Sequence, residues 1–286
     1  MRFCRFDDDR LGIVEGDVVT DVTAAAALLP PEPWPAPRGD RFMRHFDLLR
    51  PEMERLAQET EGRPLSSVRL LSPIANPGKI IGAPVNYQKH LDEARTDRAI
   101  NFGGGVRTID EYGLFLKAAS SLVGPGEGVV AARSDRRIDH EVELAVVIGR
   151  GGYAIPEDRA LEHVAGYAIG LDMTVRGTED RSFRKSFDSF SVLGPWVVTA
   201  DELPDASALD LELSIGGEVR QRSNTRLLIF GVPRLIAYAS AAYRLYPGDV
   251  IMTGTPEGVA PVQPGDVMDV RIQSIGAMKV AVRGTP

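Results

Sequence analysis

The sequence contains a single cysteine, Cys4, among its 286 residues. One cysteine cannot form a disulfide within the chain, and a free thiol fits a reducing compartment. The four histidines show none of the spacings that bind zinc. A disulfide-stapled scaffold and a zinc centre are therefore excluded.

Long hydrophobic runs are also missing. No stretch approaches the ~20 apolar residues that a membrane helix needs. The apolar run at residues 24–29 is short and follows acidic residues, so it is not the core of a signal peptide with a basic front. The 33 Lys and Arg residues are outnumbered by 40 Asp and Glu residues, so no basic stripe for nucleic acid is expected. We expect a cytoplasmic protein that binds neither membranes nor nucleic acids.

Glycine and proline, by contrast, are abundant. The 29 glycines and 20 prolines make up about a sixth of the chain, against roughly 12% in an average protein. This composition predicts many turns between short strands. We predict a mostly β (α+β) fold with a small N-terminal α/β domain at residues 1–72 and a larger domain at residues 73–286.

The pattern of apolar residues predicts the individual elements. Strands are expected at residues 2–6, 141–148, 166–175, 192–199, 249–253 and 267–272. Hairpins are expected within residues 11–22 and 209–222, and helices at residues 40–60, 156–165 and 232–245.

Two glutamates, Glu141 and Glu143, alternate at the start of a strand whose remainder is apolar on both faces. Alternate residues of a strand share one face, so the two carboxylates lie side by side. A solvated pair is the common explanation, but a strand buried on both sides requires a cation for such a pair. Asp172 ends another apolar stretch and fits the same site. Three carboxylates suit Mg²⁺, Mn²⁺ or Ca²⁺.

At this point the sequence resembles the fumarylacetoacetate hydrolase superfamily, in the branch of the acylpyruvate hydrolases and the 2-hydroxyhepta-2,4-diene-1,7-dioate isomerases. The resemblance rests on five motifs in order over about residues 77–283. They are the opening segment at 77–90, Glu141-x-Glu143, Asp172-x-Thr174-x-Arg176, the lysine motif at 185–196 and the loop at 247–259.

The resemblance implies a mixed β-sandwich or roll for the catalytic domain, a homodimer, and a role for each matching position. Glu141, Glu143 and Asp172 would bind the metal. Lys185 would stabilise a developing enolate, unless it only forms a surface ion pair with Asp188.

The resemblance also implies the groups that hold a substrate. Thr255 and Tyr87 would bind it. Arg176 would hold a carboxylate of the substrate or pair with the metal-bound carboxylates.

His90 and Glu93 lie three residues apart, which puts them on one face of a helix. A carboxylate beside histidine fixes its tautomer and suits a base that activates water. A solvated helix turn is the alternative. The resemblance implies a catalytic acid–base pair.

Two features depart from the family pattern. Glu179 stands where a substrate-binding glutamine is usual, and residues 97–113, with Gly103, Gly104 and Gly105, form a longer connection than usual. This connection is a mobile lid or an ordinary loop.

The function implied is metal-dependent hydrolysis of a C–C bond in a 1,3-dioxo carboxylate. The alternatives are decarboxylation, isomerisation or hydration of 2-oxo dioic acids in aromatic or sugar-acid catabolism.

Overall fold

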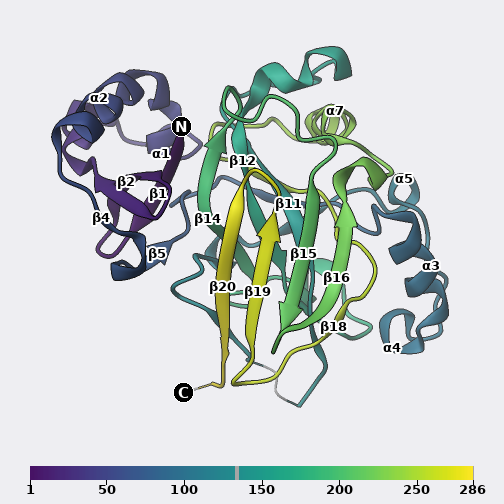
Figure 1. The fold of residues 1–286 in the computed structure, drawn as a ribbon. Coiled ribbons are helices and arrows are strands. Elements are labelled where there is room, and N and C mark those ends of the chain that lie inside the picture. Colours follow the sequence, from purple (N-terminus) through teal and green to yellow (C-terminus); the bar gives the residue numbers. More distant parts are fainter. Residues whose placement is uncertain (133–134, 286) are drawn as a thin grey trace.

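A computed structural model describes residues 1–132 and 135–285 (Figure 1). Its α-helices are α1 (Arg41–Arg44), α2 (Phe46–Glu59), α3 (Gln88–Thr96), α4 (Arg98–Asn101), α5 (Ile109–Tyr112), α6 (Arg181–Arg184) and α7 (Val232–Ala242). Its 3₁₀ helices are η1 (Thr23–Leu28), η2 (Leu65–Ser67), η3 (Ala119–Ser121), η4 (Glu157–His163) and η5 (Thr225–Leu227). Within the described ranges, no helix is long and apolar enough to cross a membrane.

The strands outnumber the helices, as the composition predicts. The first ten are β1 (Arg2–Phe6), β2 (Arg10–Glu15), β3 (Val18–Asp21), β4 (Arg63–Pro64), β5 (Leu70–Leu71), β6 (Ile80–Gly82), β7 (Phe115–Lys117), β8 (Leu122–Val123), β9 (Val129–Val130) and β10 (Ile138–His140). The others are β11 (Val142–Ile148), β12 (Val164–Asp172), β13 (Thr174–Val175), β14 (Ser191–Thr199), β15 (Asp210–Ile215), β16 (Glu218–Asn224), β17 (Val250–Met252), β18 (Ala260–Pro261), β19 (Val267–Ile272) and β20 (Gly276–Arg283).

Two large sheets form the body of the molecule. The first runs β4-β3-β2-β1-β14-β12-β11-β17-β6-β7, with β5 added to β1 and β8 added to β14. The second runs β16-β15-β19-β20-β9 and lies across the first (Figure 1). A smaller sheet joins β13, β10 and β18. The predicted mostly β, mixed sandwich is confirmed.

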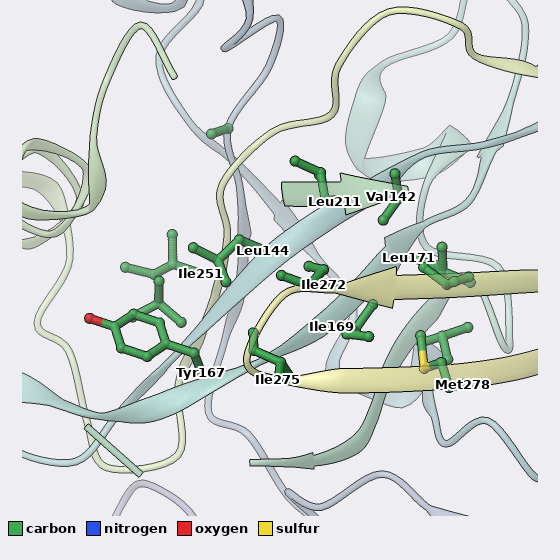
Figure 2. Close-up of a cluster of buried hydrophobic side chains, with 14 of the residues drawn as sticks. Val142, Leu144, Tyr167, Ile169, Leu171, Leu211, Ile251, Ile272, Ile275 and Met278 are labelled. Atoms are coloured by element: carbon green, nitrogen blue, oxygen red, sulfur yellow. The ribbon is translucent and has the colours of Figure 1, made fainter. Parts of the chain in front are cut away.

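The main core fills the space between the two large sheets. Leu144 and Ile169 of the first sheet meet Leu211 and Ile272 of the second (Figure 2). Burying each such aliphatic side chain contributes about 1.5–3 kcal/mol, so this interface fixes the central strands β11 and β12. Both of these strands lead directly into the predicted metal ligands.

The N-terminal segment is continuous with the rest of the fold. Strand β1 pairs antiparallel with β14, with Arg2 opposite Val198. Phe3 and Leu49 share a second hydrophobic cluster with Val147 and Leu193. The first sheet therefore crosses the domain boundary that we predicted at residue 72.

Most predicted elements appear, and the differences have local causes. The helix expected at 40–60 is divided at His45 into α1 and α2. The strand expected at 166–175 is interrupted at Met173, where the chain passes from the first sheet to the small one. The helix expected at 156–165 is wrong: it is the 3₁₀ helix η4, and β12 already begins at Val164.

Candidate active site

Three buried carboxylates meet where the two central strands approach each other. Glu141 lies between β10 and β11, Glu143 is the second residue of β11, and Asp172 is the last residue of β12. The backbone N–H of Asp172 donates to the carbonyl of Glu141 at 2.9 Å, which fixes the register at this point. One oxygen of each carboxylate lies within 4.8 Å of the other two. The strands therefore converge on one all-oxygen cluster.

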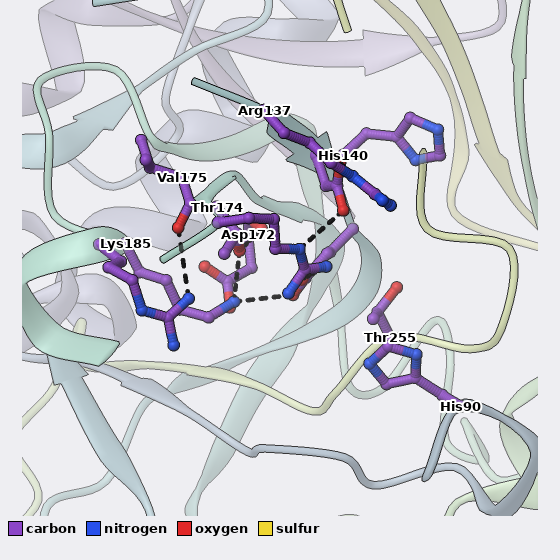
Figure 3. Close-up of polar contacts among 12 residues, drawn as sticks. His90, Arg137, His140, Asp172, Thr174, Val175, Lys185 and Thr255 are labelled. Carbon is purple, nitrogen blue, oxygen red and sulfur yellow. Dashed lines mark hydrogen bonds and ion pairs between the residues drawn. The ribbon is translucent and has the colours of Figure 1, made fainter. Parts of the chain in front are cut away.

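Lys185 contacts two of these carboxylates (Figure 3). Its Nζ donates to Glu141 Oε2 and Asp172 Oδ2, both at 2.7 Å, and to Thr174 Oγ1 at 2.6 Å. The side chain is buried, and Asp188 is exposed. The ammonium group therefore belongs to the carboxylate cluster and not to a surface ion pair.

Arg176 pairs with carboxylates of the protein. Its Nη2 donates to Glu141 Oε1 at 2.9 Å and its Nε donates to Asp139 Oδ2 at 2.7 Å. Of the two roles that we considered, the structure thus shows the pairing with a predicted metal ligand.

Lys117, at the end of β7, is a member of the cluster that the sequence analysis missed. Its side chain is fully buried, contacts Asp172 Oδ1, and donates to the carbonyl of Phe190 at 2.7 Å. Burial, reinforced by the nearby Lys185, lowers the pKa of Lys117, although Asp172 opposes that shift. The only sequence signal is a lysine that ends an apolar run, which is too common to identify a site.

The electrostatics of the cluster leave a place for a cation. Burial opposes ionisation of Glu141, but Lys185 and Arg176 lower its pKa overall. Burial and the carboxylates of Asp172 and Glu141 raise the pKa of Glu143 well above its ordinary range. No lysine or arginine in the described part of the chain forms an ion pair with Glu143. Because the group is buried, offers only oxygen atoms and includes one carboxylate without an ion-pair partner among the described residues, it fits a hard divalent cation.

The loop at residues 253–258 connects this cluster to the predicted acid–base pair. The N–H of Gly254 donates to Glu143 Oε2 at 2.6 Å, and the N–H of Gly258 donates to Glu93 Oε1 at 3.0 Å. Both glycines have a positive φ, +101° and +90°. A Cβ at Gly258 would lie 2.1 Å from the carbonyl oxygen of Arg220. Glycine is required here because only it combines this φ with such a close approach.

His90 and Glu93 both lie on α3 (Gln88–Thr96), as predicted. His90 Nδ1 lies 2.8 Å from Glu93 Oε2. With the Nδ1 proton donated to the carboxylate, Nε2 is the nitrogen left to accept a proton. The histidine is nearly buried, with an exposed fraction of 5%, and lines the same cavity as the three carboxylates.

Thr255 lines that cavity too, and a second residue that we missed orients it. Gln221, on β16, donates from Nε2 to Thr255 Oγ1 at 2.8 Å and to the carbonyl of Pro256 at 2.9 Å. Its Oε1 accepts from the N–H of Val142 and from His140 Nδ1, both at 3.0 Å. Since the Thr255 oxygen accepts from Gln221, its own proton is free to be donated into the cavity.

The cavity has a volume of about 400 Å³. Its walls include residues of α3, the segment 97–113, α6 and the loop at 253–258. The segment 97–113, expected to be a lid or loop, contains α4 and α5 and contributes Phe102, Gly104 and Tyr112 to the wall.

The comparisons with known proteins agree with this geometry. Residues 79–283 match the family "Fumarylacetoacetate (FAA) hydrolase C-terminal". The chain belongs to the fumarylacetoacetate hydrolase family. It is 54% identical over 285 residues to maleylpyruvate hydrolase of Aquipseudomonas alcaligenes, covering 99% of each chain.

Solved structures of this family extend the comparison. The maleylpyruvate hydrolase of Sphingobium sp. SYK-6, in complex with manganese(II) and pyruvate, is 40% identical, covers 100% of both chains and has a TM-score of 0.84. A 5-carboxymethyl-2-hydroxymuconate delta-isomerase from Mycobacterium smegmatis is 32% identical over 100% of both chains, with a TM-score of 0.72.

The structure brings nearly all the residues predicted from the family motifs to one cavity. Two of them lie outside the cavity wall: Glu93, which holds His90, and Tyr87. Tyr87 has 1% of its surface exposed, because it immediately precedes α3 and bridges to Leu228. Burial, with smaller contributions from Glu143 and Glu257, raises the pKa of Tyr87. Contact between Tyr87 and a substrate is not supported by this position.

Glu179, which replaces the usual glutamine, does line the cavity. Arg136 holds its carboxylate at 2.7 and 2.9 Å. This hydrogen bonding lowers the pKa of Glu179 to about 2.

Proposed function

We propose that this chain hydrolyses a C–C bond in a 1,3-dioxo carboxylate of the acylpyruvate type, with Mg²⁺ or Mn²⁺ as its cofactor. The observation that carries the proposal is that His90, whose Nδ1 lies 2.8 Å from Glu93, lines a single cavity together with the carboxylate cluster and Lys185. The names of the maleylpyruvate hydrolases, one of them bound to manganese and pyruvate, support the same reaction. The proposal also includes a homodimer that works in the cytoplasm, where the free Cys4 stays reduced.

Glu141, Glu143 and Asp172 would hold the metal. Bound there, a divalent cation polarises the keto and carboxylate oxygens of a 2-oxo acid as a Lewis acid. Thr255 would donate its hydroxyl proton to a substrate oxygen. Lys185, held by Glu141 and Asp172, places positive charge beside the site.

His90 would act as the general base. Its Nε2 accepts a proton from water, Glu93 stabilises the resulting imidazolium, and the water oxygen attacks the carbonyl carbon distal to the carboxylate. The C–C bond then breaks, and its electron pair passes to the pyruvyl fragment, whose negative charge faces Lys185. The proton held by His90 returns to that fragment, so the products are pyruvate and a carboxylic acid.

Isomerisation is the second candidate, because the structural relative from Mycobacterium smegmatis is named an isomerase. Isomerisation requires no attacking water. The pair of the nearly buried His90 and the half-buried Glu93 is suited to activating water and therefore favours hydrolysis over isomerisation for this chain.

The test compares wild type with His90→Ala. Each Mn²⁺-loaded protein is incubated with acetylpyruvate, maleylpyruvate or fumarylpyruvate, and pyruvate and CO₂ are followed by mass spectrometry. We expect pyruvate release by wild type and a loss of kcat of about 10²–10⁴-fold in the variant, with KM changed little because the base acts in the transition state.

His163→Ala is the matched control, because His163 lies outside the cavity wall. A His90→Ala variant with the wild-type rate would remove His90 from the mechanism. CO₂ release without hydrolysis would replace the proposed reaction by decarboxylation.

A further inference from the structure

Three arginines line the cavity: Arg176, Arg181 and Arg184. They differ in what neutralises them. Arg176 is held by the carboxylates of Asp139 and Glu141. Its charge is therefore already matched by the protein and is not free for a second anion.

Arg184, the last residue of α6, has no carboxylate partner in the described ranges. Its Nε donates to the backbone carbonyl of Glu179 at 2.7 Å, and its Nη1 lies 3.3 Å from the carbonyl of Val175. These contacts hold the guanidinium in place, and among residues 1–132 and 135–285 no acceptor bonds to Nη2. Burial, together with the nearby Arg176 and Arg181, lowers the pKa of Arg184. The group is thus fixed and partly buried, with two further arginines and the carboxylates of Glu141 and Glu179 nearby.

Arg181, at the start of α6, is the second arginine without a carboxylate partner among the residues that the structure describes. Its guanidinium lies 3.8 Å from the centre of the Tyr112 ring, which belongs to the segment 97–113 and also lines the cavity. A guanidinium stacked on an aromatic ring keeps its N–H donors available at its edge.

The nearest acidic candidate does not neutralise these groups. Glu179 carries a carboxylate on the same wall, but both of its oxygens are taken by Arg136. Arg184 contacts only the backbone carbonyl of Glu179. Asp180, which also lines the cavity, accepts from the N–H and hydroxyl of Ser182 and forms no ion pair with Arg181 or Arg184 in the described ranges. The metal ligands therefore lie in one part of the cavity wall, and α6 contributes two arginines that are not in carboxylate ion pairs.

We propose that Arg184, assisted by Arg181, binds the distal carboxylate of the substrate, so that the enzyme selects dicarboxylic over monocarboxylic acylpyruvates. This inference rests on the proposed function and names its substrate class. The 2-oxo acid end of the substrate lies at the carboxylate cluster, and the acyl chain extends towards α6. Arginine suits this position because its planar fork matches a carboxylate.

The test uses two ligands that cannot undergo the proposed hydrolysis. 2-Oxoheptanedioate and 2-oxoheptanoate share the seven-carbon chain and the 2-oxo acid end, and differ only in the terminal carboxylate. Each is titrated by calorimetry into the Mn²⁺-loaded full chain. We expect wild type to bind the dicarboxylate about 10- to 100-fold more tightly, the range for a charge-assisted hydrogen bond.

Arg184→Gln should abolish this preference while the affinity for 2-oxoheptanoate stays within about threefold of wild type. Arg181→Gln should reduce the preference in part. Arg159→Gln removes one exposed positive charge that does not line the cavity, and should keep the preference in full.

Equal affinity of wild type for both ligands would overturn the proposal. An Arg184→Gln variant that loses the same affinity for both ligands would also overturn it, since such a loss indicates a structural role for Arg184. Failure of both ligands to bind would also overturn it. Hydrolysis of acetylpyruvate by the same preparations reports on the proposed function separately, because that substrate has no distal carboxylate.

Discussion

At the scale of single residues, Glu143 is the carboxylate on which metal binding depends most directly. We predict that Glu143→Ala weakens Mn²⁺ binding by more than the roughly 10–100-fold loss typical of an outer-shell partner, because two carboxylates remain for a cation that prefers six oxygens. The metal-free variant should be at least as stable as wild type, since one of three crowded carboxylates is gone.

Calorimetric titration with Mn²⁺ measures the affinity, and thermal unfolding in EDTA measures the stability. Asp188→Ala, which removes an exposed carboxylate, is the control. Wild-type affinity in Glu143→Ala would remove this residue from the site.

Gln221 leads to a second prediction, because its amide orients Thr255. In Gln221→Glu, a carboxylate oxygen replaces the amide N–H₂ and accepts the Thr255 proton that the substrate would otherwise receive. We predict a rise in KM for acetylpyruvate of about tenfold, the value of one hydrogen bond, with a smaller change in kcat. Steady-state kinetics measures both. A fall in kcat at unchanged KM would show that Gln221 does not act through substrate binding.

The sequence and the family motifs predicted those site residues that lie in a motif and contact residues of another motif. Glu141, Glu143 and Asp172 lie together in one cluster, and Lys185 contacts two of them. Gln221 could not be predicted in the same way, because it reaches Thr255 from a strand of the other sheet. Such a contact depends on how the sheets pack, and a polar residue on an otherwise ordinary hairpin gives no sign of it.

At the scale of elements, α2 is linked to the residues that follow β14 by an ion pair whose carboxylate titrates at low pH. Arg50 on α2 donates to both oxygens of Asp201 at 3.2 and 2.7 Å. Hydrogen bonds from Arg50 and Thr199 lower the pKa of Asp201. Because the pKa of Asp201 is lower in the folded state than its unfolded value of 3.8, the ionised carboxylate stabilises the fold at pH values above 3.8. This contribution is lost as the pH falls below 3.8 and the carboxylate takes up a proton.

We therefore predict that Asp201→Asn lowers the free energy of unfolding at pH 7 by less than about 1 kcal/mol, because the pair is largely exposed. The difference from wild type should shrink as the pH is lowered below about 4. Urea unfolding in EDTA at several pH values measures it, with the exposed Asp8→Asn as the control. A difference that grows towards low pH would contradict this role.

Elements were predictable where the local pattern was strong. The alternation and turn glycines around residues 209–222 correctly gave the hairpin of β15 and β16. The short helices α4 and α5 were not predicted, because each has only four residues and no repeating apolar face. The 3₁₀ helix η4 was mistaken for a longer helix because its apolar spacing runs on into β12.

At the scale of the whole molecule, the shared sheet argues against independent folding of residues 73–286. Removing residues 1–72 would leave β14 without β1 and expose Val147 and Leu193 of the shared cluster. An unpaired apolar edge strand promotes aggregation. We predict that this fragment is recovered mainly in the insoluble fraction under conditions in which the full chain is soluble.

Fractionation after expression and light scattering of any soluble material test this prediction. A soluble fragment with full Mn²⁺ affinity would show that the boundary at residue 72 separates two autonomous units.

The pairing of β1 with β14 also has a consequence for the timing of biosynthesis. Strand β1 cannot pair with β14 until the ribosome has made Val198, the residue opposite Arg2. At about 5–20 residues per second, a ribosome needs roughly 10–40 s to make the chain between them. During that interval the edge of β1 that β14 later covers is open, and closing so distant a contact is intrinsically slow. A chaperone would therefore protect this protein most during this interval, when the N-terminal segment has emerged and β14 has not yet been made.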